Sequence, residues 1–205
     1  MKFSPAPAVF LFIALLTAVL GGCAVVPQPV GEQENVAWQR HLTWVQGQPD
    51  WRLKGRFALS VGHRGLSGGL EWQQEGSRYR IEVFGPLGRT QAILKGGIEW
   101  VSLKLAGKPP RTARSASGLM RETLGWSLPV AGLRFWVRGI SAPDSAPVKM
   151  RIDGAGRAVF IRQDGWKIHY LEYDVALGPQ ALPTRIRLVH GDVRIMLLID
   201  RWENG

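Results

Sequence analysis

Cysteine is nearly absent from this sequence. The 205 residues contain one, Cys23. A single thiol cannot form a disulfide within the chain, so stability must come from a packed core. The four histidines, His41, His63, His169 and His190, have no close ligand spacing, and no metal site or cofactor is expected. The sequence also lacks a P-loop and a dinucleotide-binding fingerprint, so nothing indicates nucleotide-driven work.

Acidic residues are scarce. The chain has 16 of them against 26 Lys and Arg, which gives a formal net charge of +10. Such a balance favours nucleic acid, anionic lipid headgroups or an acidic protein as a partner. The Lys and Arg residues are spread through alternating segments and form no run, which is typical of solvated strand faces. The secretory signal described next argues against nucleic acid.

Long apolar runs are missing except near the N-terminus. Residues 8–20 are apolar apart from Thr17, follow Lys2, and precede Gly21 and Gly22. This stretch is shorter than the roughly 20 residues that a membrane-spanning helix needs. A positive start, a short apolar core and small residues predict a secretory signal peptide over residues 1–22. The alternative is an ordinary signal peptide that ends near a cysteine by chance.

Leu20-Gly21-Gly22-Cys23 resembles the lipobox of bacterial lipoproteins, although Gly21 is less usual there than Ala or Ser. The resemblance implies cleavage before Cys23, lipidation of its thiol and, because Ala24 is not Asp, delivery to the outer membrane. Residues 23–34 then form a flexible tether with Pro27 and Pro29. Residues 35–205 are long enough for one domain with a core of its own.

The mature chain alternates between apolar and polar residues over long stretches. A short amphipathic helix is predicted over 34–46, and Gly47 ends it. From residue 51 the period is two: apolar residues of 51–61, 66–72 and 79–83 share one face and polar residues the other. Further strands are predicted around 91–95, 99–105, 148–152, 158–163, 166–173, 185–189 and 193–202. This alternation predicts an antiparallel sheet with one apolar face.

Two helices are predicted in the middle of the chain. Ser117 can cap the first, which runs to Leu124, and Pro129 can start the second, with Gly139 just beyond its end. The fold class is therefore α+β. About ten strands in one sheet would curl strongly, and helices closing the apolar concave face would enclose a pocket.

Gly65-Leu66-Ser67-Gly68-Gly69 matches the G-x-S-x-G pattern of a nucleophile elbow. An elbow requires a turn from a strand into a helix, with an acid and a histidine later in the chain. Here the pattern leads into a strand, and Ser67 falls on its polar face. We therefore expect a coincidence and no enzyme, and a lipolytic enzyme built on Ser67 is the third hypothesis.

A turn follows the strand that ends near Phe84. Gly85-Pro86-Leu87-Gly88 places Gly and Pro on both sides of one apolar residue. Such a turn can present Leu87 at a loop tip, or Leu87 can fold back onto the core. The residues alone favour the second arrangement.

Together these segments resemble the LolB family of outer-membrane lipoproteins. The likeness covers nearly the whole mature chain and rests on the lipobox, Gly55-Arg56-Phe57, Leu70-Glu71-Trp72, Gly85-Pro86-Leu87-Gly88, Leu124-Gly125-Trp126, Leu128-Pro129-Val130, Trp136 to Gly139, Gln163 with Gly165-Trp166, Leu182-Pro183 and Trp202. It implies an incomplete, strongly curved antiparallel β-barrel of about ten strands, lidded by a few helices around a hydrophobic cavity for acyl chains.

The resemblance also implies a role. A soluble periplasmic carrier, LolA, would hand over lipoproteins, and this chain, a monomer facing the periplasm, would insert them into outer-membrane phospholipid. Leu87, flanked by Pro86 and Gly88, would be the apolar tip that touches the membrane. From the alternation we predict ten cavity residues, for each of which solid core is the alternative: Trp51, Leu53, Phe57, Leu59, Leu70, Trp72, Ile81, Val83, Leu133 and Trp136. The second functional hypothesis is an assembly lipoprotein whose sheet is a protein-binding scaffold.

Overall fold

The computed structural model describes residues 32–145, 147 and 149–204. The predicted signal peptide, Cys23 and the tether up to residue 31 lie outside these residues. Residues 32–34, predicted as the end of the tether, already belong to the first described helix, α2 (Glu32–Gln46). None of the helices in the described ranges is long and apolar enough to cross a membrane.

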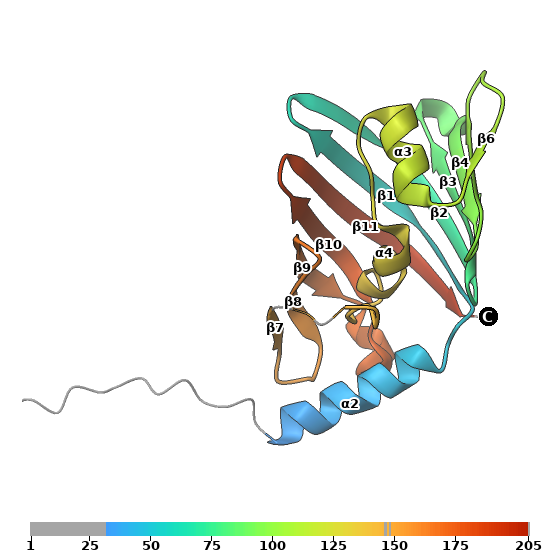
Figure 1. The fold of residues 1–205 in the computed structure, drawn as a ribbon. Helices are drawn as coiled ribbons and strands as arrows, with labels where there is room; N and C mark the ends of the chain where they lie inside the picture. The colour runs from blue at the N-terminus through green and yellow to red at the C-terminus, as the bar shows by residue number, and fades with distance from the viewer. Residues whose placement is uncertain (1–31, 146, 148, 205) are drawn as a thin grey trace, which may run out of the picture. The chain divides into compact units, whose positions relative to one another are not determined.

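Eleven strands form one antiparallel sheet, in the order β6-β5-β4-β3-β2-β1-β11-β10-β9-β8-β7. Their bounds are β1 Trp51–Val61, β2 Arg64–Glu75, β3 Arg78–Phe84, β4 Thr90–Gly96, β5 Val101–Leu105, β6 Arg111–Ala113, β7 Lys149–Ile152, β8 Ala158–Gln163, β9 Trp166–Tyr173, β10 Pro183–His190 and β11 Val193–Asn204. Two meanders, β1 to β6 and β7 to β11, are joined where β1 pairs with β11. The order ends at β6 and β7, so the sheet is not closed, and Figure 1 shows it curving around α3 and α4.

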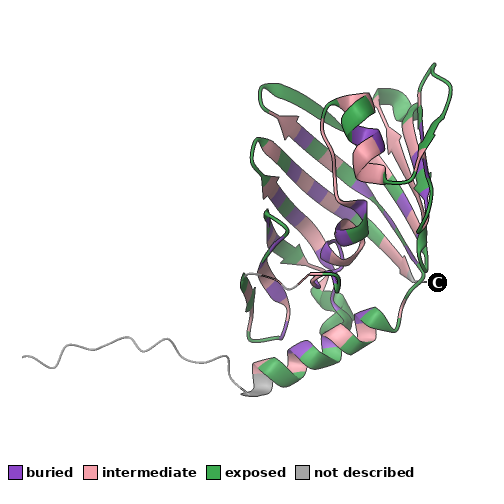
Figure 2. Cartoon of the chain, in the orientation of Figure 1, coloured by how far each residue is buried: buried purple, intermediate pink, exposed green. Residues whose placement is uncertain are grey.

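The predicted alternation is visible in the burial of each strand. In β1, Trp51, Leu53 and Leu59 are buried, whereas Arg52, Lys54 and Arg56 are exposed. Figure 2 shows this striping of buried and exposed residues across the central strands. The inward set forms the hydrophobic core, which includes residues of both meanders and of the helices. The sheet therefore has one apolar inner face and one polar outer face.

Two helices, α3 (Ala116–Leu124) and α4 (Val130–Trp136), lie over the inner face of the sheet (Figure 1). The cap of α3 differs from the prediction. Ser115 caps it by accepting a hydrogen bond from the Gly118 amide at 3.1 Å, and the Ser117 hydroxyl instead donates to the Leu128 carbonyl. Gly125 ends α3 in the left-handed conformation at φ 80°, where glycine has no steric penalty.

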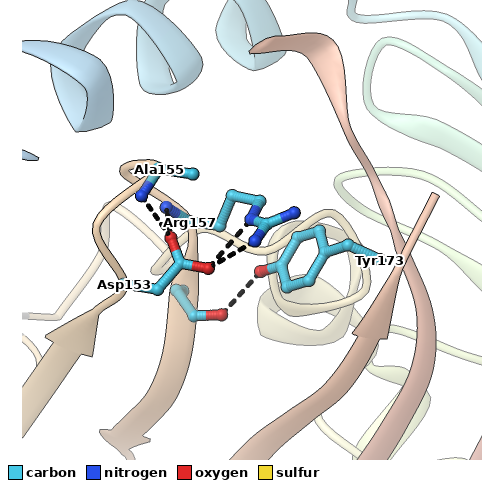
Figure 3. A network of polar contacts seen from close by, with 5 residues as sticks. Asp153, Ala155, Arg157 and Tyr173 are labelled. Carbon is cyan, nitrogen blue, oxygen red and sulfur yellow. Dashed lines mark hydrogen bonds and ion pairs between the residues drawn. The ribbon is translucent and has the colours of Figure 1, made fainter. Parts of the chain in front are cut away.

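Helix α2 packs at the other end of the domain, against the 3-10 helix η2 (Val175–Gln180) and the β7–β8 turn. In that turn the Asp153 carboxylate accepts from the backbone amides of Ala155 and Arg157 and pairs with the Arg157 guanidinium at 2.7 Å (Figure 3). The Tyr173 hydroxyl donates to the Ala158 carbonyl at 2.7 Å. Gly156 lies so close to the α2 backbone that a Cβ at this position would be 2.4 Å from the backbone nitrogen of Trp38. The tight turn thus fixes α2 against the β7–β8 end of the sheet.

Candidate functional site: an apolar cavity and an exposed loop

A cavity of about 480 Å³ lies between the inner face of the sheet and helices α3 and α4. Its size is that of a pocket for a small-molecule ligand. Among the described residues that line it none is charged. Gln91 and Ser67 are polar residues of the lining, but strand alternation directs the Ser67 side chain to the outer face of the sheet. The lining consists of Phe57, Leu59, Leu66, Ser67, Leu70, Trp72, Ile81, Val83, Phe84, Gly85, Pro86, Gln91, Ala92, Leu94, Leu103, Leu105, Met120, Leu124, Trp126, Leu128, Val130, Leu133, Val137, Leu188, Ile195 and Leu197. Such a lining suits an apolar ligand without a buried charge.

Seven of the ten residues predicted for the cavity line it. They are Phe57, Leu59, Leu70, Trp72, Ile81, Val83 and Leu133. Six come from β1, β2 and β3, where the strict alternation left no doubt about which residues point inward. Leu133 comes from α4 and closes the cavity from the side opposite the sheet.

The other three predicted residues lie in solid core outside the lining. Trp51 packs its ring against those of Trp72 and Trp202, with centroids 5.2 and 5.6 Å away. Leu53 is likewise fully buried in the core. Strand β1 extends past the cavity toward α2, so its first inward residues meet other side chains rather than open space.

Trp136, the third of these residues, anchors the end of α4. Its indole nitrogen donates to the Gln163 side-chain oxygen at 2.7 Å, and that oxygen also accepts from the Ala142 amide at 2.9 Å. The Gln163 amide nitrogen donates to the Ala142 carbonyl at 2.8 Å, so this fully buried side chain is satisfied. The network ties α4 to strand β8 and thereby holds the lid in place.

Arg138 supports the same region from the next turn of the chain. It is buried, its guanidinium donates to the Val45 carbonyl at the end of α2, and it lies 5.8 Å from the centre of the Trp51 ring. Burial lowers its pKa to about 10, because an apolar environment disfavours the charged form. Arg138 thus connects α2, α4 and β1 where the core is solid.

Sequence reasoning missed much of the lid and one wall. Met120 and Leu124 of α3 and the connection with Trp126 and Leu128 line the cavity, as do Leu94 and Leu103 of β4 and β5. Extending the alternation through the predicted strands 91–95 and 99–105 would have found Leu94 and Leu103, but no face was assigned to those strands. The lid residues carried a weaker signal, because a helix of nine residues and a short connection do not reveal which side covers the sheet.

The β3–β4 connection forms a tight loop around the short 3-10 helix η1 (Pro86–Gly88). The Gly85 amide donates to the Arg89 carbonyl at 2.9 Å, and the Gly88 amide donates to the Gly85 carbonyl at 3.2 Å. Leu87 sits between them with φ +65°, an uncommon conformation for a bulky L-residue. Its side chain is 94 % exposed, so the residue does not fold back onto the core.

The loop and the cavity are adjacent. Gly85 and Pro86 belong to the cavity lining, and the next residue, Leu87, points into solvent. The hydrogen bonds of the loop hold Leu87 in a strained backbone conformation with its large apolar side chain in solvent. The geometry therefore joins an apolar cavity to an apolar tip at its rim.

The structure gives no elbow around Ser67, which lies within strand β2 and not at a turn into a helix. Gly68 in the same motif lies so close to β3 that a Cβ would fall 2.1 Å from the Phe84 carbonyl oxygen. The close packing of β2 against β3 thus explains why residue 68 is a glycine. Among the described residues no three His, Cys, Asp or Glu side chains come together as a metal site.

Comparison with known proteins agrees with this geometry. The fold is similar to that of a LolA superfamily protein from Nitrosomonas europaea, with a TM-score of 0.51 at 10 % identity over 82 % of this chain and 93 % of that one. This likeness concerns the fold alone.

Sequence relatives are considerably nearer. The outer-membrane lipoprotein LolB of Nitrosococcus oceani is 37 % identical over 95 % of this chain and 98 % of its own length, and that of Stutzerimonas stutzeri is 36 % identical over 94 % of each. The model of the family described as outer membrane lipoprotein LolB matches residues 43–202. The chain therefore belongs to the LolB family of outer-membrane lipoproteins.

Proposed function

We propose that this protein accepts lipoproteins from a LolA-like periplasmic carrier, holds their acyl chains in the cavity, and inserts them into the outer membrane. The observation that carries the proposal is the uncharged cavity of about 480 Å³ with Leu87 exposed at its rim. Family membership supports the same role. The protein acts as a monomer, without a cofactor and without catalysis.

The physical need for such a receptor follows from the cargo. Each CH₂ group exposed to water costs about 0.8 kcal/mol, so the acyl chains of a lipoprotein face tens of kcal/mol in free solution. Acyl chains must therefore pass directly from one apolar cavity to another and then to the bilayer. Sites ordered by increasing affinity can drive this exchange without ATP.

The proposal includes a lipid anchor on Cys23, with the domain facing the periplasm. Cleavage before Cys23 and acylation of its thiol would retain the receptor at the membrane that its cargo must enter. Intact-mass measurement of the mature protein should give a chain that starts at Cys23 and carries added acyl mass. A mature chain with a free thiol would contradict the anchor.

The scaffold hypothesis expects a filled interior. The cavity argues against it, because its apolar walls enclose unfilled space where a scaffold would pack side chains. An enzyme built on Ser67 would need a turn that strand β2 does not provide.

Leu87→Glu tests the role of the loop. Burying a leucine side chain contributes about 1.5 to 3 kcal/mol, so the variant should insert cargo about 10- to 100-fold more slowly. Acceptance of cargo from the carrier should stay near the wild-type level, because Leu87 lies outside the cavity. Both steps can be followed with purified carrier–lipoprotein complex and vesicles.

The matched control is Ile98→Glu, which changes a leucine-sized side chain that is 82 % exposed on the β4–β5 turn. This turn lies at the opposite end of β4 from η1, so insertion should proceed normally. Wild-type insertion by the Leu87→Glu protein would remove the loop from the mechanism.

A further inference from the structure

Cations gather on the outer face of the β7–β11 half of the sheet. Directly paired residues on antiparallel neighbours share a face, and the pairs Lys149 with Arg162 and Arg162 with Lys167 place three cations in one row. The full set, called the basic face below, is Lys149, Arg151, Arg162, Lys167, Arg187 and Arg194. All six side chains are exposed.

In the part of the chain that the structure describes, no acidic side chain forms an ion pair with the basic face. Three cations elsewhere on the outer face are paired: Lys54 with Glu71 at 3.2 Å, Arg56 with Asp200 at 2.8 Å, and Arg185 with Glu172 at 2.9 Å. Within the described residues none of the six cations takes part in an ion pair. The pKa of His169, which lies among them, is lowered by burial and by the charges of Arg187, Arg151 and Lys167. The local potential is therefore positive.

Beside this charge the outer surface is hollowed. A groove of about 520 Å³ runs over β10, β11, β1 and β2, with Arg187 and Arg194 along one side. Ala58, Ser60 and Ser67 form its floor, because their small side chains stand between taller neighbours. Ser67 of the G-x-S-x-G motif thus lies where it can donate a hydroxyl hydrogen bond to an anion.

We propose that the groove between Arg187, Arg194 and Ser60, together with the basic face, binds the phosphate of anionic phospholipid headgroups at the membrane surface. The inference rests on the membrane role proposed above. Guanidinium groups and hydroxyls are the donors that a phosphate requires, and clusters of four to eight cations are typical of surfaces that bind anionic lipid.

Apolar side chains at the edge of the groove favour a lipid surface over an acidic protein. The groove ends at Leu66, which is 54 % exposed near the β1–β2 turn. That turn and the Leu87 loop lie at the same end of the sheet, so apolar tips and cations face one amphiphilic surface together.

Ser60→Cys in the full lipidated chain provides a reporter in the groove. Since Cys23 is the only native cysteine and its thiol would be acylated, the introduced thiol reacts alone. Its labelling by a membrane-impermeant maleimide should slow about 10-fold when phosphatidylglycerol is added to phosphatidylcholine vesicles. Ser77→Cys, on the β2–β3 turn at the other end of the sheet, should label equally in both. Equal labelling of the Ser60→Cys thiol in both vesicles would overturn the proposal.

Charge variants identify the groups responsible. Adding Arg187→Gln and Arg194→Gln to Ser60→Cys should restore fast labelling in anionic vesicles. The matched pair Lys54→Gln and Arg201→Gln removes the same charge from ion-paired positions and should leave labelling slow. Slow labelling in the first pair would show that these arginines do not hold the headgroup.

Soluble anions distinguish the ligand class. Protection of the Ser60→Cys thiol by polyglutamate in neutral vesicles, stronger than that by phosphatidylglycerol, would assign the face to an acidic protein. If inorganic phosphate protects the thiol as well as phosphatidylglycerol does, the groove is a simple anion site and the lipid proposal is overturned. Cargo transfer into neutral vesicles separates this inference from the proposed function. If the protein transfers no cargo while phosphatidylglycerol still protects the Ser60→Cys thiol, only the receptor role is refuted.

Discussion

His41 is a titratable side chain placed where it resists protonation. It is buried on α2 between the rings of Trp38 and Trp44, with centroids 6.1 and 6.3 Å away. Burial lowers its pKa from the usual 6.5, and the charges of Arg138 and Arg157 act in the same direction. The Pro179 and Arg138 carbonyls oppose this shift, but neither reaches hydrogen-bond geometry with the ring. The folded protein therefore disfavours the protonated form of His41.

This lowered pKa predicts a loss of stability in weak acid. Below about pH 6.5, His41 binds a proton more readily in the unfolded chain than in the folded protein. The free energy of unfolding therefore falls as the pH falls toward the folded pKa. Above about pH 6.5 the contribution is complete. One such group gives a slope of at most about 1.4 kcal/mol per pH unit. Urea unfolding between about pH 7.5 and 5.5 measures it.

Two other groups serve as references for this slope. The pKa of His169 is also lowered, but its side chain is only partly buried, so His169→Gln should remove a small part of the slope. The pKa of Asp153 lies below 3.8, outside this window. His41→Gln should remove most of the slope. An unchanged slope in that variant would assign the acid sensitivity to another group.

At the scale of elements, alternation predicted most strands of the sheet to within a few residues. Strand β6 escaped because Arg111–Ala113 has too few residues to show a period, and it raises the expected ten strands to eleven. The predicted cap of α3, Ser117, lies two residues after the observed cap, Ser115, because either serine could serve as a cap from the sequence alone. What alternation could not supply is the position of the helices above the sheet. Because of that position, Phe57 faces a cavity, whereas Leu53, four residues earlier on the same face of β1, faces solid core.

Helix α4 offers a direct test of the cavity. Leu133 points into it, whereas Ala131 on the same helix is exposed. Leu133→Trp should fill part of the space and weaken binding of the fluorescent fatty acid cis-parinarate about 10-fold, or about 1.4 kcal/mol. Ala131→Leu adds bulk to the solvent side and should leave the affinity unchanged. Fluorescence titration of both variants gives the comparison.

Either of two outcomes would contradict this assignment. Unaltered affinity of Leu133→Trp would show that fatty acid binds elsewhere. Equal weakening by Ala131→Leu would show that α4 is merely sensitive to substitution. Circular dichroism would establish that each variant retains its sheet.

On the scale of the whole molecule, the two meanders and the helices enclose an apolar cavity that their side chains do not fill. Protein interiors are normally packed to the density of organic crystals, and unfilled apolar space forfeits dispersion contacts. A ligand with acyl chains supplies the missing contacts only in the folded state. Its binding must therefore stabilise the whole domain.

This linkage predicts a rise in melting temperature with acyl ligand. At about 100 times its dissociation constant, a ligand adds about 2.7 kcal/mol, which for a domain of this size raises the melting temperature by about 5 to 10 °C. Calorimetry with cis-parinarate should show this rise in the wild type and in Leu87→Glu, because the loop lies outside the cavity. Leu133→Trp should lose much of it. A wild-type melting temperature that ignores saturating ligand would mean that the cavity does not hold acyl chains, whereas a rise lost in Leu87→Glu would make the loop part of the binding site rather than the group that acts after it.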